Sequence, residues 1–158
     1  MDLDAVIGSL DWAWESSPPQ QDPARVKAAL HSIASGQSEV AVAWAVAALQ
    51  DAAGNSHAAV LFPVAAPAAA VMLAVAGRWR AEARAQALVS LAEMLETEVL
   101  PGYDSYERDG VMVDVEQVIK GHVRNALPLL RSIAAGPQPW QHNRRLARSL
   151  IELSTDDA

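Results

Sequence analysis

Apolar residues recur along most of the chain at the three- and four-residue spacing of an amphipathic helix. Stripes of this kind run through residues 26–33, 88–99, 111–123 and 146–153. Residues 39–49 are apolar on several sides, which is typical of a helix packed between neighbours. No segment alternates for long enough to predict a strand, and Val111–Val113 gives only a short hint. The pattern therefore predicts an all-α protein.

Helix-capping residues support these boundaries. Asp22 stands before Pro23, which is typical of a helix start, because aspartate accepts a bond from a free backbone N–H. Glycine ends helices because it adopts the left-handed conformation at little cost, and apolar runs are followed by Gly36, Gly77 and Gly136. We therefore expect helices to begin after Asp22 and to end near each of these glycines.

The stretch Ala58–Ala76 contains no charged residue over 19 positions, close to the length of a membrane span. However, it contains Pro63 and Pro67, is mostly alanine, and has no basic cluster at either flank. The stretch therefore predicts a helix buried inside the protein and not a membrane span.

A short repeat is visible at two of the helix ends. Leu30–Gly36 and Leu130–Gly136 share five of seven residues, and Leu73–Gly77 is a weaker match to the same pattern. The three glycines are 41 and 59 residues apart. A period near 41 matches helix-pair repeats, so we interpret the surplus of 18 residues as an insertion visible at residues 100–112. Insertions into such arrays map to loops on one face, often the binding face.

Charge is concentrated around this insertion. Residues 93–116 carry eight acidic side chains against one basic side chain, Arg108, and their sum of −7 equals the net charge of the whole chain. Both tyrosines, Tyr103 and Tyr106, lie in the same stretch. Tyrosine is enriched at interface hot spots, and clustered acids steer a positively charged partner. The stretch therefore predicts a contact surface for a basic partner.

Catalytic patterns are missing from the sequence. The chain has no cysteine, which excludes a disulfide framework and a thiolate metal site. His31, His57, His122 and His142 are scattered, and no Gly-x-Ser-x-Gly elbow or glycine-rich phosphate loop is present. His122 falls on an apolar stripe and is expected in the core or at its rim. We therefore expect no enzymatic activity, no cofactor and no metal site.

The tryptophans are expected to serve packing. Trp44 falls inside the apolar segment 39–49 and is predicted to lie in the core. Trp79 and Trp140 follow helix-ending glycines and would fill turns between helices. Trp12 and Trp14 are two residues apart, so on a helix they would not share a face. One of these two is predicted to be exposed.

Three segments resemble small bacterial HEAT-like helical-repeat proteins. They are Asp11–Trp12 before a proline-rich turn, Phe62–Pro67 ahead of an apolar helix, and Asn125–Leu130 with its internal Pro128. The resemblance covers residues 3–153 and implies an α-α superhelix. Proteins similar to this are mostly binding modules, and some stand beside bacterial toxins as immunity proteins.

We therefore expect one HEAT-like domain of about three helix pairs over residues 1–153, an acidic loop at 100–112 and a disordered tail at 154–158. The acidic N-terminus lacks the basic flank of a signal peptide, which predicts a cytoplasmic protein without a membrane partner. The leading hypothesis is a non-enzymatic immunity or inhibitor protein that occludes a basic partner, such as a toxin. The predicted contact residues are Glu96, Glu98, Tyr103, Asp104, Tyr106, Glu107 and Asp109.

Two alternatives remain open from the sequence. The chain could self-associate as an assembly module through an exposed apolar face. It could also bind nucleic acid through its basic C-terminal part, with Arg144, Arg145 and Arg148 as the contact residues. The net negative charge and the small number of bases disfavour nucleic acid.

Overall fold

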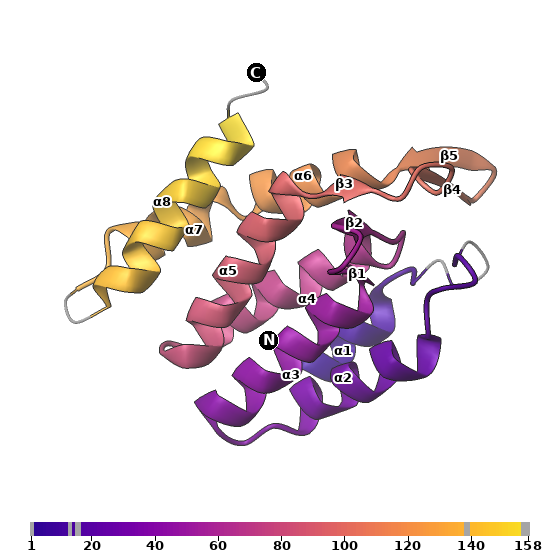
Figure 1. The fold of residues 1–158 in the computed structure, drawn as a ribbon. Coiled ribbons are helices and arrows are strands. Elements are labelled where there is room, and N and C mark those ends of the chain that lie inside the picture. Colours follow the sequence, from indigo (N-terminus) through magenta and orange to yellow (C-terminus); the bar gives the residue numbers. More distant parts are fainter. Residues whose placement is uncertain (1, 13, 15–16, 138–139, 156–158) are drawn as a thin grey trace.

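The computed structural model describes residues 2–12, 14, 17–137 and 140–155. These residues form eight helices and five short strands (Figure 1), and 66% of the described residues are helical. The predicted mainly helical character is confirmed, whereas the expectation that no strands would form is wrong. No helix within the described ranges is both long enough and apolar enough to cross a membrane.

The N-terminal part of the chain folds into helices α1, α2 and α3, which span Leu3–Ser9, Pro23–Ser35 and Glu39–Ala52. Asp22 caps α2 as predicted, because its carboxylate accepts the Ala24 N–H at 2.9 Å. Gly36 follows α2 with an extended backbone and not a left-handed one. A side chain there is excluded by packing, since an added Cβ would lie 2.5 Å from Val42 Cγ2 of α3.

Helix α4 (Ala65–Arg78) forms the centre of the molecule. Its residues Ala65–Ala69, Val71–Leu73, Val75 and Ala76 are all buried. The prediction of a buried helix is confirmed from Ala65 onward, whereas residues 58–64 form a turn and a short strand instead. Gly77 lies inside α4, one residue before its end, and not beyond the helix as expected.

Helix α5 (Glu82–Glu96) has no capping side chain of its own. Glu39, at the start of α3, takes that role from across the fold. Its carboxylate accepts backbone N–H groups of Arg80, Ala81 and Ala83 at 2.8, 3.0 and 3.0 Å. Burial raises the pKa of Glu39, but these three donors outweigh burial and the net pKa is lower than usual. The starts of α3 and α5 are thereby joined.

Three two-residue strands lie beside the ends of α3 and α5. Strands β1 (Gly54–Asn55) and β2 (Val60–Leu61) pair antiparallel, and β2 pairs parallel with β3 (Glu98–Val99). Val99 was expected to continue the helical stripe of α5, but α5 ends at Glu96. Such short strands leave no readable alternation in the sequence.

The predicted insertion loop is a β-hairpin. Strand β4 (Ser105–Arg108) pairs antiparallel with β5 (Val111–Asp114), with Tyr106 opposite Val113. The connecting residues Asp109 and Gly110 both have positive φ angles, 51° and 78°, as a two-residue type I′ turn requires. Val111 and Met112 therefore belong to a strand, and the helical stripe predicted over 111–123 begins only at Val115.

The C-terminal part of the chain forms α6, α7 and α8, which span Val115–Asn125, Leu127–Ala134 and Gln141–Thr155. The buried Asn143 side chain donates to the Arg80 carbonyl at 2.9 Å, which fixes α8 beside the turn between α4 and α5. Helix α8 continues through Ser154, which is buried, and Thr155. The prediction of disorder is therefore wrong for these two residues, and 156–158 lie outside the described residues.

The helices pack in two neighbouring rows. Helix α5 packs between α3 and α8, while α4 packs against α1, α5 and α6 (Figure 1). Large side chains fill the space between the rows, including Leu49, Met72, Leu88 and Leu91, which are fully buried. This body carries the hairpin and the ends of α3 and α5 at one edge.

Candidate functional site

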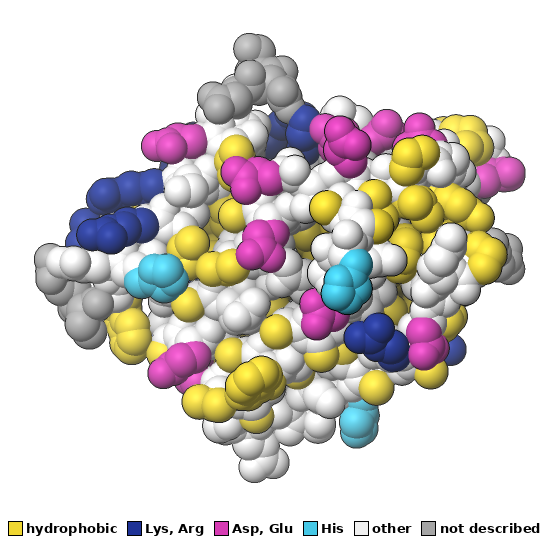
Figure 2. Space-filling model, in the orientation of Figure 1, with side chains coloured by type: hydrophobic (Ala, Val, Ile, Leu, Met, Phe, Trp, Pro, Cys, Tyr) yellow, Lys and Arg dark blue, Asp and Glu magenta, His cyan; other side chains and the backbone are white. Residues whose placement is uncertain are grey.

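Six exposed carboxylates follow one another along that edge: Glu93 and Glu96 on α5, Glu98 on β3, and Asp104, Glu107 and Asp109 around the hairpin. We call these six residues the acidic edge. Figure 2 shows acidic side chains along the upper rim of the molecule, with hydrophobic side chains beside them. The predicted contact residues Glu96, Glu98, Asp104, Glu107 and Asp109 are all exposed, and they belong to or border elements that lie along this edge.

Tyr106, also predicted to contact the partner, is buried instead, with 4% of its surface exposed. It lines a small hollow together with Pro67, Val118 and His122. Burial raises the pKa of its hydroxyl, and the nearby Asp11 adds to this effect. Tyr106 therefore anchors the hairpin to the body, and Tyr103 is half-buried.

Arg108, the single base of the acidic stretch, points back to the body. Its Nε lies 3.9 Å from an Asp11 carboxylate oxygen and 4.0 Å from one of Asp109. On the same hairpin, Val111 and Met112 are 63% and 64% exposed. The hairpin thus combines exposed acids with two exposed apolar side chains, a mixture that is typical of interaction surfaces.

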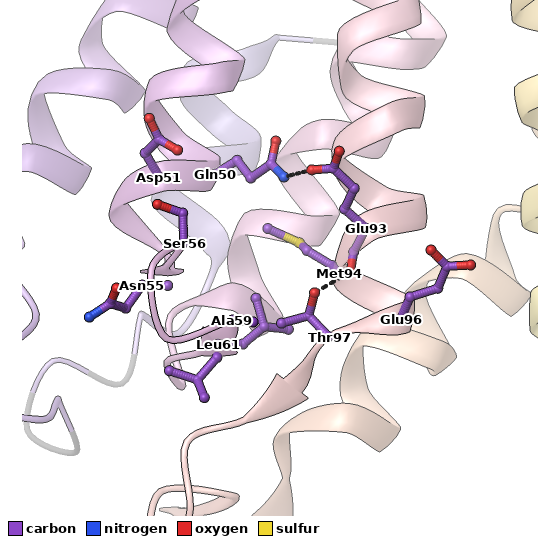
Figure 3. Close-up of a pocket in the computed structure, with 12 residues that line it drawn as sticks. Gln50, Asp51, Asn55, Ser56, Ala59, Leu61, Glu93, Met94, Glu96 and Thr97 are labelled. Atoms are coloured by element: carbon purple, nitrogen blue, oxygen red, sulfur yellow. Dashed lines mark hydrogen bonds between the residues drawn. The ribbon is translucent and has the colours of Figure 1, made fainter.

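A pocket of about 280 Å³ opens at one end of the acidic edge, between the ends of α3 and α5 and the β1–β2 turn (Figure 3). Asp51, Glu93 and Glu96 supply three carboxylates to its lining, and Met94 and Leu61 supply apolar surface. We call it the acidic pocket. Carboxylates together with apolar side chains in one pocket suit the charged head and the stem of a lysine or arginine side chain.

A hydrogen-bond chain holds one wall of the acidic pocket. Gln86 donates to the Ser90 hydroxyl, which donates to Gln50 Oε1 at 2.6 Å. Gln50 in turn donates its Nε2 hydrogen to Glu93, and Figure 3 shows the two side chains pointing toward each other. On the opposite wall, Asn55 Oδ1 accepts the His57 and Ala58 N–H groups, which fixes the β1–β2 turn. The side chains of Gln50, Glu93 and Asn55 are therefore held in place.

The histidines stay apart, as the sequence indicated. His31, His57 and His142 are exposed, while His122 is half-buried beside Tyr106. Burial lowers the pKa of His122, and the charge of Arg108 lowers it further. Within the described ranges, no group of three or more histidine or carboxylate side chains is placed to hold a metal ion.

The alternative basic face lies away from the acidic edge. Gln141, Arg144, Arg145 and Arg148 surround a shallow hollow of about 260 Å³ on α8. Figure 2 shows basic side chains gathered at the left, over α8, and acidic ones along the top. No ion pair joins these arginines to the acidic edge among the residues that the structure describes.

The predictions for Trp44 and for the pair Trp12 and Trp14 were wrong. Trp44 was predicted in the core, but it is 74% exposed, next to Val40, which is 55% exposed. Trp12 and Trp14 were expected on different faces, yet their rings stack with centroids 5.7 Å apart; Trp12 is buried and Trp14 half-buried. Trp79 is half-buried and Trp140 is 38% exposed. The exposed Trp44 adds an apolar face on α3 that the sequence reading missed.

Comparison of the chain with protein-family models, with curated proteins and with solved structures finds no match. The geometry and charge of the acidic edge are therefore the features that bear on function.

Proposed function

We propose that this protein is a HEAT-like binding module that docks a partner with a basic surface through its acidic edge. The observation that carries the proposal is the gathering of six exposed carboxylates from α5, β3 and the hairpin. Within the described residues, Glu96, Glu98, Asp104 and Glu107 have no cation within ion-pair distance. A basic partner would therefore meet carboxylates that have no counter-charge within the described part of the protein.

The position of the acids on α5 adds to this argument. Glu93 and Glu96 lie in the last turn of the helix, where the negative end of the macrodipole makes a carboxylate unfavourable by about 0.3–1 kcal/mol. A cation bound beside these carboxylates offsets this unfavourable interaction with the macrodipole. Relief of that interaction therefore adds to the free energy of binding. The acidic pocket is the place where a lysine or arginine of the partner would enter.

The hairpin supplies the apolar part of the proposed interface. Met112 lies opposite Glu107 in the strand register, and Val111 lies opposite Arg108. Met112 and Val111 are exposed between the acids, so a partner that covers them removes apolar surface from water while its bases meet the carboxylates. The partner class that fits is a protein with apolar and basic residues side by side, such as a toxin enzyme that this protein would occlude as an immunity protein or inhibitor.

The proposed repeat architecture is supported by the packing of consecutive helices. Helices α2 and α3, α4 and α5, and α7 and α8 pack as three pairs, and α3, α5 and α8 follow one another in one row. A helical array of this kind offers long surfaces for protein partners. The hairpin lies in the connection between the second pair and α6, where the insertion was predicted.

Charge reversal at the edge tests this function. The protein is used as bait to isolate its partner, and affinity is then measured for the wild type, Glu107→Lys and Glu152→Lys. Glu152 is also exposed but lies on α8, so both variants change the net charge equally. Glu107→Lys should weaken binding about tenfold or more at low salt, and Glu152→Lys should not. Equal affinities of the two variants would show that the edge is not the docking surface.

The exposed face of α3 supports a second candidate function, self-association into an assembly. Trp44 and Val40 border a hollow of about 230 Å³ that Ala43, Ala47, Glu82 and Gln86 complete. Light scattering of the wild type and of Trp44→Ser over a range of concentrations separates the candidates. A mass that is constant in both proteins rejects self-association, and a concentration-dependent mass that Trp44→Ser abolishes supports it.

A further inference from the structure

A larger cavity, of about 560 Å³, lies between α1, α4, α6 and α7. We call it the apolar cavity, and it shares no lining residue with the acidic pocket. Val6, Leu73 and Leu129 form much of its wall, and seven of its ten lining residues are apolar or glycine. Its volume and its mostly apolar lining fall within the range of small-molecule sites, about 300–1,000 Å³.

Small residues on α4 create this space. Ala70, Ala74 and Gly77 recur at helical spacing on one face of α4, and each of them lines the cavity. A Cβ added to Gly77 would lie 3.5 Å from Leu129 Cδ2, which is ordinary contact distance. The side chains at these three positions are only methyl groups or a hydrogen atom. They therefore leave open the gap between α4 and α7 that larger side chains would fill.

The polar groups of the apolar cavity carry positive charge or none. Arg78 is exposed at the end of α4, and its guanidinium lies 6.0 Å from the centre of the Trp79 ring. No carboxylate lines the cavity, and no described carboxylate pairs with Arg78. His122 and Asn125 complete the polar lining. Because burial lowers the pKa of His122, its imidazole is neutral near pH 7 and can donate one hydrogen bond.

We propose that the apolar cavity binds a small anionic amphiphile, an aliphatic carboxylate whose chain lies between α4 and α7 and whose carboxylate pairs with Arg78. The apolar walls favour the chain, since each buried methylene contributes to affinity. The unpaired guanidinium favours the carboxylate, which it can bind through two parallel hydrogen bonds. A cationic amphiphile is disfavoured because Arg78 repels it and because no acidic side chain lines the cavity to supply a counter-charge. This activity is separate from partner binding at the acidic edge.

Calorimetric titration with octanoate tests the proposal on the full-length protein. Octanoate should bind at one site, and hexanoate about tenfold or more weakly, because two methylenes are lost at about fourfold each. Octanol and octyltrimethylammonium, whose alkyl chains are one carbon longer but carry no carboxylate, should bind at least about tenfold more weakly than octanoate. Absence of octanoate binding, or equal binding of octanoate and octanol, overturns the proposal.

Two variants locate the binding. Arg78→Gln should weaken octanoate about tenfold and leave octanol unchanged, whereas the matched control Arg145→Gln, an exposed arginine on α8, should change neither. Ala74→Phe fills the cavity and should abolish binding of both ligands, with circular dichroism to verify its fold. If Ala74→Phe is folded and still binds octanoate, or if both arginine variants weaken octanoate equally, the carboxylate binds elsewhere and the proposal fails. Neither variant alters the acidic edge, so these outcomes are independent of the proposed partner binding.

Discussion

Removing the Glu39 carboxylate should destabilise the fold more than its position on the surface suggests. Glu39 accepts three N–H groups at the start of α5, a helix that has no capping side chain of its own. Ala83 is fully buried, so without Glu39 its N–H is poorly placed to find water. An unsatisfied buried donor costs about 1–3 kcal/mol, and loss of a helix cap about 0.5–2 kcal/mol.

These effects overlap, and the Arg80 N–H can bond to water once the carboxylate is gone. Glu39 is only half-buried, which further reduces the charge contribution through solvent screening. We therefore expect Glu39→Ala to lower the free energy of unfolding by about 2 kcal/mol, and Glu39→Gln, which keeps one acceptor oxygen, by about 1 kcal/mol. For a chain of this size the first change lowers Tm by roughly 4–8 °C.

The pH dependence gives a second measure of the same contact. The folded-state pKa of Glu39 is lowered from its usual value of 4.5, so its contribution is fully present above that value and is lost as the pH falls through the folded-state pKa. The stability difference between wild type and Glu39→Gln should therefore be constant from pH 7 to about 5 and shrink below about 4.5. Urea unfolding followed by circular dichroism at several pH values measures both quantities.

The control is Glu82→Gln. Glu82 lies in the first turn of α5 as Glu39 lies in the first turn of α3, so both substitutions remove one favourable charge from a helix start. Glu82 caps no N–H group in the described structure, and its substitution should cost at most about 0.5 kcal/mol. If Glu39→Gln costs no more than Glu82→Gln, or if the difference persists unchanged at pH 3, the cross-fold cap does not contribute as argued.

Four further substitutions have expected outcomes by denaturant unfolding. Gly110→Val places a β-branched residue at φ 78° and should cost about 1–3 kcal/mol, with loss of hairpin order by NMR. Gly77→Ala has room beside Leu129 and should stabilise the protein by about 0.5–1 kcal/mol through helix propensity; a loss of stability would contradict the packing described. Trp44→Ser, at a 74% exposed position, should cost under about 1 kcal/mol, whereas Trp12→Ala in the core should cost about 3 kcal/mol or more.

The helices were predictable because their signals are local. Asp22 with Pro23 marks the start of α2, and the uncharged run around Pro67 marks the central buried helix, each without knowledge of a neighbour. Trp44 failed because α3 is apolar on most sides. Its buried stripe is Val42, Ala45, Val46 and Leu49, and only the packing of α2 and α5 decides that Trp44 lies outside that stripe.

The turn of the hairpin could have been predicted from the sequence, but the helical spacing of apolar residues over 111–123 led to the prediction of a helix there. Asp109–Gly110 is the residue pair that a type I′ turn favours, and it stands between two short β-forming runs. Reading that turn would have placed Tyr106 and Arg108 on one face of a strand, since side chains alternate. The apolar cavity, in contrast, could not be predicted from the sequence. Small residues such as Ala70, Ala74 and Gly77 occur both where a neighbouring helix packs closely and where a space stays open.

The burial of Tyr106 removes it from the set of contact residues but favours the acidic edge as a docking surface. A free loop would lose conformational entropy on binding, which weakens affinity. Here the Tyr106 ring and the Arg108–Asp11 ion pair hold the hairpin against α1, α4 and α6 before any partner arrives. Glu107 and Met112 are then presented side by side on a strand pair of fixed register. Because the ordering takes place during folding, contacts with a basic partner contribute more fully to affinity.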